Sequence, residues 1–140
     1  MPSVQSHVPK FSGHQLGALR NALGILSDDR SKVKPQRLKD VTHLNSSATA
    51  KALQVSRPQM YQKEIKLNPK LMKNIILLVH ASDLVYELIG ESVEETAKWV
   101  MAPNSMLKGD SPFEVCIRGD GQLVIDWLNA RLGRVAGQAF

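Results

Sequence analysis

Residues 68–90 read NPKLMKNIILLVHASDLVYELIG, and this stretch decides the fold. Its apolar residues recur at steps of three and four, which is the spacing of one helix face. The stretch opens with Asn-Pro, which suits the first turn of a helix, and closes with Gly90, a residue type that ends helices. The pattern predicts a helix of roughly five turns between Pro69 and Ile89. Since it carries more apolar surface than one small domain needs, we expect it to join two halves of the chain and to offer a dimer contact along Leu71–Ile89.

The chain upstream of this helix contains further helical patterns. Residues 1–10 resemble a loose tail, and from Ser12 to Leu26 leucines follow one another at helical spacing. A second, shorter helix is expected after Pro35, ending near His43. No strand pattern of alternating apolar and polar residues occurs, so the sequence predicts an all-α protein.

Two predicted helices form a candidate helix-turn-helix. The first begins at Asn45-Ser46-Ser47, a run of residue types that cap helix N-termini. The second spans Ser56–Ile65 and opens with a Ser-x-x-Gln capping box, with proline tolerated in its first turn. The turn between them carries Gln54, where glycine is common because the backbone there is left-handed.

The second helix of this pair offers the side chains that a DNA reader uses. Arginine and glutamine make paired hydrogen bonds to guanine and adenine edges, whereas lysine and tyrosine suit phosphates. The alternative is an ordinary helical hairpin in an all-α core. The predicted DNA-binding residues are Lys51, Ser56, Arg57, Gln59, Tyr61, Gln62 and Lys63.

Charge divides the chain into a basic and an acidic part. Residues 1–80 contain 13 lysines and arginines against 4 aspartates and glutamates, whereas residues 81–140 contain 5 against 9. Opposite charge in one small chain indicates two partners of different character. The basic part suits nucleic acid, although a merely solvated charged surface has the same composition.

Residues 99–133 read WVMAPNSMLKGDSPFEVCIRGDGQLVIDWLNARLG, short helical patterns separated by glycine and proline. Before them, a capping box opened by Ser92 predicts a helix that ends at Pro103. Another capping box, with proline at the first helical position, predicts a short helix over Pro112–Ile117. Asp120 is expected to cap the last helix, Gln122–Leu132. The predicted buried face of that helix is Leu123, Val124, Trp127, Leu128 and Leu132.

The sequence contains no constellation that carries catalysis. Its four histidines, including His43 and His80, are far apart and lack metal-ligand spacing. Cys116 lies in an apolar run without a nearby base, which predicts a small core residue. We therefore expect no enzyme, no cofactor and no metal site. A single cysteine, no signal core and no membrane-length apolar segment predict a cytoplasmic protein without a membrane partner.

Residues 45–135 resemble the antitoxins of the Xre/MbcA/ParS type. The resemblance rests on the candidate helix-turn-helix and on motifs downstream of Trp99: Pro103-Asn104, Leu107 with Gly109, Ser111-Pro112-Phe113-Glu114, Gly119 with Gly121, and Val124 to Gly133. Lys108 stands where the family has a small residue, and Phe113 where it has leucine.

This resemblance implies a protein with two tasks. Family members bind a RES-domain toxin, an enzyme that consumes NAD, and cover its NAD pocket; they also bind the promoter of their own operon. The implied division is a DNA-binding domain over residues 1–68, a linking or dimerisation helix over 69–90 and a toxin-binding domain over 91–140, in a homodimer. The predicted toxin-binding residues are Asn129, Leu132, Gly133, Arg134, Val135, Gln138 and Phe140. A stand-alone helix-turn-helix regulator, with a C-terminal dimerisation or effector domain, is the alternative.

Overall fold

The computed structural model describes residues 21–133, which are mostly helical. The prediction of a helical protein is confirmed, with one small exception: two strands of two residues each form an antiparallel pair. The elements are β1 (Lys32–Val33), α3 (Pro35–Thr42), α4 (Ser46–Leu53), the 3-10 turn η1 (Pro58–Tyr61), β2 (Ile65–Lys66), α5 (Pro69–Leu88), α6 (Val93–Met101), the 3-10 turn η2 (Ser105–Leu107), α7 (Pro112–Val115), the π-helical turn η3 (Cys116–Asp120) and α8 (Gly121–Arg131).

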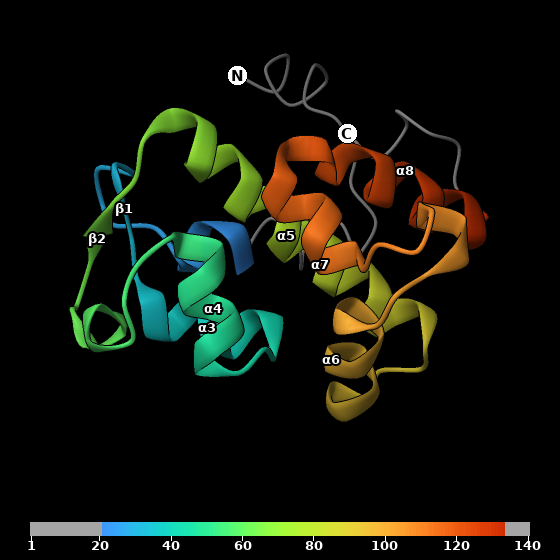
Figure 1. Cartoon of the computed structure of the whole chain (residues 1–140). Helices are drawn as coiled ribbons and strands as arrows, with labels where there is room; N and C mark the ends of the chain where they lie inside the picture. The colour runs from blue at the N-terminus through green and yellow to red at the C-terminus, as the bar shows by residue number, and fades with distance from the viewer. Residues whose placement is uncertain (1–20, 134–140) are drawn as a thin grey trace, which may run out of the picture.

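Helix α5 is the centre of the fold, as its apolar pattern predicts. The Asn68 side chain accepts a hydrogen bond from the Leu71 backbone N–H at 2.8 Å, which caps the first turn, and the helix ends before Gly90, whose φ is +84°. Helices α3 and α4 contact one side of α5, while α6, η3 and α8 contact it elsewhere (Figure 1). Its buried residues are Leu71, Asn74, Ile75, Leu78, Val79, Ala81, Ser82, Leu84 and Val85.

One continuous core joins the two halves across α5. Buried apolar residues from Ile25 to Leu128 belong to a single cluster. The long helix therefore packs on both halves along most of its length, which leaves only part of the predicted dimer surface Leu71–Ile89 exposed. Within residues 21–133, no helix combines the length and the hydropathy needed to cross a bilayer.

The short sheet holds the N-terminal half together. Val33 pairs with Ile65 and Lys32 with Lys66, and Leu26 forms an isolated bridge to Val33. Val33 and Ile65 are buried, so this pairing delivers apolar side chains from two distant segments into the core. Of the leucine pattern from Ser12 to Leu26, residues 21–24 are helical, and the earlier part lies outside the described residues.

Of three capping predictions in the C-terminal half, two are met and one is wrong. Ser92 caps α6, and Ser111 and Glu114 form the reciprocal capping box of α7, with Pro112 at its first position. Gly119 interrupts the next turn with a φ of +108°. Asp120, however, makes no capping hydrogen bond to α8, because its carboxylate accepts instead from Arg118 Nε at 3.2 Å.

The register of α8 differs from the predicted one. Its buried residues are Gly121, Val124, Ile125, Leu128 and Asn129, whereas Leu123 is 61% exposed and Trp127 and Leu132 are half-buried. The prediction followed the apolar identity of Leu123 and Trp127. The face of α8 that packs on α5 instead begins at Gly121, where the two helices approach so closely that a Cβ atom does not fit.

Cys116 occupies the core, as expected, and its surroundings make it chemically inert. Burial raises the pKa of the thiol to about 12, so the thiolate is absent near neutral pH. We expect no reaction of the native protein with a disulfide reagent such as DTNB at pH 8, and one equivalent of thiol after unfolding in urea. Rapid stoichiometric labelling of the native protein at pH 8 would contradict this placement.

Candidate functional site

The first candidate site is the exposed surface formed by α4 and η1. Helix α4 is capped by Asn45, whose side chain accepts from the Ala48 N–H, and it ends at Gln54 with φ 58° and ψ 43°. The left-handed turn expected between the two helices is thus present with glutamine in place of glycine. Leu53 and Met60 are buried beneath the surface.

The second helix of the predicted helix-turn-helix is much shorter than expected. The chain forms only the single 3-10 turn η1, and Gln62 is already extended at φ −67° and ψ 145°. Two tertiary contacts explain this ending: Gln36 Nε2 donates to the Met60 carbonyl at 2.9 Å, and Ile65 must be extended to pair with Val33. A helix continuing to Ile65 would lose that pairing.

The side chains predicted to read DNA are exposed, but those of Ser56, Arg57 and Gln59 already have partners. Gln59 Oε1 accepts from the Ser56 backbone N–H at 2.8 Å and from the Ser56 hydroxyl at 3.1 Å, so these two side chains are bonded to each other. Arg57 Nη1 donates to Ser47 Oγ at 2.8 Å, which holds the guanidinium against the start of α4. Tyr61 is 76% exposed and makes the most prominent apolar projection of the turn. The remaining predicted residues, Lys51, Gln62 and Lys63, are exposed as well.

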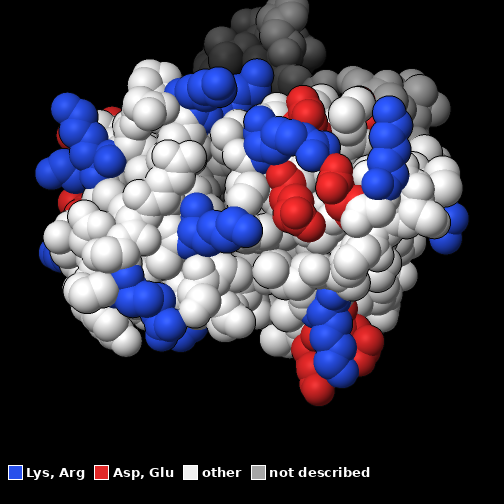
Figure 2. Space-filling model, viewed as in Figure 1, with Lys and Arg blue, Asp and Glu red and all other residues white. Residues whose placement is uncertain are grey.

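Charges on the two halves are arranged differently. Figure 2 shows lysine and arginine side chains spread over the part of the face that contains α3, α4 and the sheet, while acidic side chains gather beside basic ones over the C-terminal elements. The ion pairs within residues 21–133 all involve Lys98 or Arg118. No lysine or arginine of residues 21–80 takes part in these ion pairs, and basic residues outnumber acidic ones there, which suits a polyanion.

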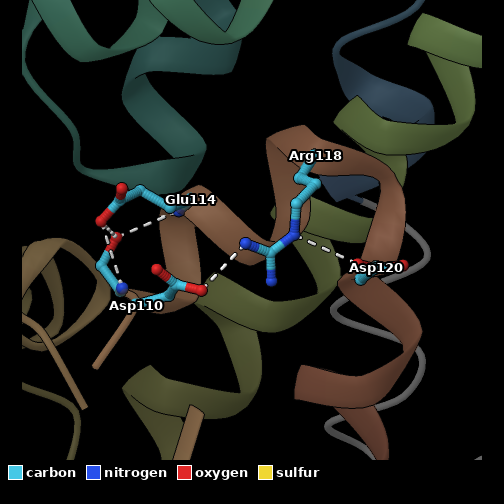
Figure 3. A network of polar contacts seen from close by, with 5 residues as sticks. Asp110, Glu114, Arg118 and Asp120 are labelled. Atoms are coloured by element: carbon cyan, nitrogen blue, oxygen red, sulfur yellow. Dashed lines mark hydrogen bonds and ion pairs between the residues drawn. The ribbon is translucent and has the colours of Figure 1, made fainter. Parts of the chain in front are cut away.

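The second candidate site surrounds Arg118 in the C-terminal half. Arg118 donates to Asp110 at 2.9 Å and to Asp120 at 3.2 Å, and it joins the loop before α7 to the start of α8 (Figure 3). Both carboxylates raise the pKa of the guanidinium. Because all three groups are partly exposed, the network contributes orientation more than stability.

An apolar groove of about 410 Å³ lies beside this network. Its rim carries Met106 and Leu123, which are 65% and 61% exposed and come from η2 and α8. Large apolar side chains with such exposure are typical of a protein contact surface rather than of a core. We name the surface formed by Met106, Leu123, Arg118 and the lining of this groove the Met106–Leu123 surface.

A stacked aromatic pair lies farther along α8. The rings of Trp99 and Trp127 stack with centroids 5.6 Å apart and an interplanar angle of 13°. Arg131 lies over the Trp127 ring, with its guanidinium carbon 5.4 Å from the centroid. The pair fastens α6 to α8 and leaves a cationic edge just before the end of the described chain.

Three of the seven predicted toxin-binding residues lie within the described part of the chain. Gly133 is exposed and Leu132 half-buried, but Asn129 is 2% exposed and faces the core, so its prediction as a contact residue is wrong. The polar character of Asn129 suggested exposure, whereas its position four residues after Ile125 puts it on the buried stripe. The other four, Arg134, Val135, Gln138 and Phe140, lie outside the described residues. The exposure of Met106 and Leu123 was not predicted, and Leu123 was assigned to the buried face of its helix because it is apolar.

Among residues 21–133, no group of histidine, cysteine, aspartate and glutamate side chains is arranged to hold a metal ion. Asp110 and Asp120 are paired with Arg118, and Glu94 and Glu95 with Lys98. Comparison with known proteins adds no assignment: no protein-family model, no curated protein and no solved structure matches this chain.

Proposed function

We propose that the chain is the antitoxin of a type II toxin–antitoxin pair, which binds a RES-domain toxin, blocks its NAD pocket and represses its own operon. The observation that carries the proposal is that residues of the motifs resembling Xre/MbcA/ParS-type antitoxins form the caps and turns of the C-terminal half. Asn104 caps η2, Ser111-Pro112 opens α7 in a capping box, and Gly119 takes a φ of +108°. These residues therefore hold turns in a frame that is organised before any partner binds, which favours tight association.

The exposed residues on that frame support a protein partner. Met106 and Leu123 flank one groove, and Arg118 is oriented beside them by two carboxylates. Exposed apolar anchors next to oriented charges are typical of protein interfaces. The contact with the toxin is thus proposed to include the Met106–Leu123 surface as well as Leu132, Gly133 and the residues that follow.

The DNA part of the proposal rests on α4 and η1. Arg57, Tyr61 and Lys63 are exposed on one short segment of the basic half, and Lys51 lies on the preceding helix. Since η1 is a single turn, we expect it to present few base contacts and to rely on phosphate contacts for most of its affinity. A dimer has two such surfaces and binds two half-sites, which compensates for the weak binding of each surface alone.

Neutralisation of the toxin is the decisive test. The chain is co-expressed with a RES-domain toxin, and growth and NAD content are measured. We expect Leu123→Glu combined with Met106→Glu to lose rescue, because a buried unpaired carboxylate costs several kcal/mol at an interface. Val93→Glu, on α6 and 51% exposed, is the matched control and is expected to rescue.

Two further outcomes separate the alternatives. Rescue by a chain ending at Gly133 would place the inhibitory contact on the described surface rather than in residues 134–140. Failure of the unaltered chain to protect against the toxin, with promoter binding retained, would replace the antitoxin proposal with the stand-alone regulator. For the promoter, Arg57→Ala is expected to weaken binding by about 1–3 kcal/mol, with Lys98→Ala as a control.

A further inference from the structure

A third groove is lined by residues that belong to neither of the surfaces above. It has a volume of about 570 Å³ and is formed by the N-terminal half of α5, strand β2 and the loop before β1. Its floor consists of Met72, Ile76 and Leu77, which are partly exposed. Met72 and Ile76 are four residues apart, so they form one stripe along α5 that no described element covers. We name this feature the Met72 groove.

The rim of the Met72 groove carries positive charge alone. Arg30, Lys66 and Lys73 line it and are exposed, and no aspartate or glutamate is among the lining residues. None of these three cations takes part in the ion pairs found within residues 21–133. Lys66 also lies directly opposite Lys32 across the two strands, and a like-charged cross-strand pair is destabilising. An anionic group bound at the rim relieves this repulsion.

We propose that the Met72 groove binds an apolar segment of a partner protein that carries acidic residues beside its apolar side chains. The apolar floor accounts for the first property and the three unpaired cations for the second. A DNA backbone satisfies the rim but gains nothing from Met72, Ile76 and Leu77. This surface is separate from the proposed toxin and DNA contacts and does not depend on them.

Charge also decides against the other occupants at hand. A second copy of the chain, joined groove to groove, brings a second set of the same three cations to the interface. Residues 1–20 contain Lys10 and Arg20 and no aspartate or glutamate, so they offer the rim nothing of opposite charge. Neither a groove-to-groove dimer nor residues 1–20 supply acidic residues to the rim, and we assign the occupant to another protein.

The test uses the full chain and a defined probe. The probe is a fluorescein-labelled peptide in which pairs of leucine alternate with pairs of glutamate, and its counterpart has lysine in place of glutamate. We expect the glutamate peptide to bind and the lysine peptide not to bind, as measured by fluorescence anisotropy. Lys66→Glu combined with Lys73→Glu is expected to weaken the glutamate peptide by about tenfold or more and to allow the lysine peptide to bind. Met72→Glu is expected to weaken binding of the glutamate peptide as well, because it places a charge on the apolar floor of the groove.

Controls make each failure interpretable. Lys51→Glu changes the same charge on α4, outside the groove, and is expected to leave peptide binding unchanged while weakening DNA. Circular dichroism verifies that every variant is folded.

Equal binding of both peptides, no binding of either, or no effect of the Lys66 and Lys73 reversals overturns the proposal. If a DNA duplex displaces the glutamate peptide from the unaltered chain, and binds the Lys66→Glu, Lys73→Glu variant no longer, the rim is assigned to nucleic acid instead. A concentration-dependent dimer abolished by Met72→Glu assigns the groove to a second copy.

Discussion

Phe113→Ala is expected to lower the free energy of unfolding by about 3–5 kcal/mol. Phe113 is 1% exposed and is among the largest fully buried side chains. It lies on the four-residue helix α7, which contacts α6 and α8, so the cavity opens where three C-terminal elements meet. Since a domain of this size is stabilised by about 5–15 kcal/mol in total, the loss is a large fraction of its stability. Urea unfolding followed by tryptophan fluorescence measures it, because Trp99 and Trp127 report from the same half of the chain.

Two comparison variants identify the cavity as the cause. Phe113→Leu keeps most of the apolar volume and introduces the residue usual at this position in the antitoxins that the sequence resembles; we expect a loss of about 1 kcal/mol. Leu123→Ala removes a large apolar side chain that is 61% exposed and is expected to change stability by no more than about 0.5 kcal/mol. If Phe113→Ala and Leu123→Ala cost the same, Phe113 is not a core residue.

Gly121→Ala is expected to lower the free energy of unfolding by about 1–3 kcal/mol through overpacking. A Cβ at position 121 lies 2.9 Å from Leu77 Cβ and 3.4 Å from Cys116 Sγ. The backbone at Gly121 is right-handed helical, with φ −57°, so conformational strain plays no part. Because Leu77 Cβ is fixed to the α5 backbone, α8 has to move away from α5 to admit the methyl group. Thermal or urea unfolding measures the loss.

Gly24→Ala is the matched control for this prediction. Residue 24 is also helical, and the atom nearest to an added Cβ is Arg37 Nε at 3.8 Å, an ordinary contact. There the same substitution is expected to raise stability by up to about 1 kcal/mol, because alanine favours a helix over glycine. Changes of the same sign and size at the two positions would contradict the close α5–α8 approach. The same displacement of α8 is expected to reduce rescue by Gly121→Ala in the toxin assay.

The elements that were predicted well are those whose signals are local. Asn45, Asn68, Ser92 and Ser111 each begin a helix where their side-chain types predict one, since a capping side chain acts within three residues of its own position. The αL turn at Gln54 and the interruption at Gly119 follow from equally short-range requirements. The site residues on α4 and η1 were located in the same way, and they are exposed.

The errors fall where distant segments compete with local preference. The helix expected over Ser56–Ile65 ends at Tyr61, because Ile65 gains more from pairing with Val33 in the core than from one further helical turn. Asp120 does not cap α8, because its carboxylate accepts a hydrogen bond from Arg118, which also donates to Asp110. Neither partner can be identified from the spacing of residues near the site.

The sequence by itself determined the helical class, the extent of the central helix and most helix ends, because caps, glycines and apolar periodicity act over one or two turns. Only the tertiary structure decided which face of α8 is buried, how short η1 is and where the open grooves lie. The buried face of α8 depends on the contact between Gly121 and Leu77. The length of η1 depends on the pairing of Val33 with Ile65, which are 32 residues apart in the sequence. The position of the groove on α5 depends on which of its side chains remain uncovered. Packing selects among the faces and registers that local chemistry leaves equally acceptable.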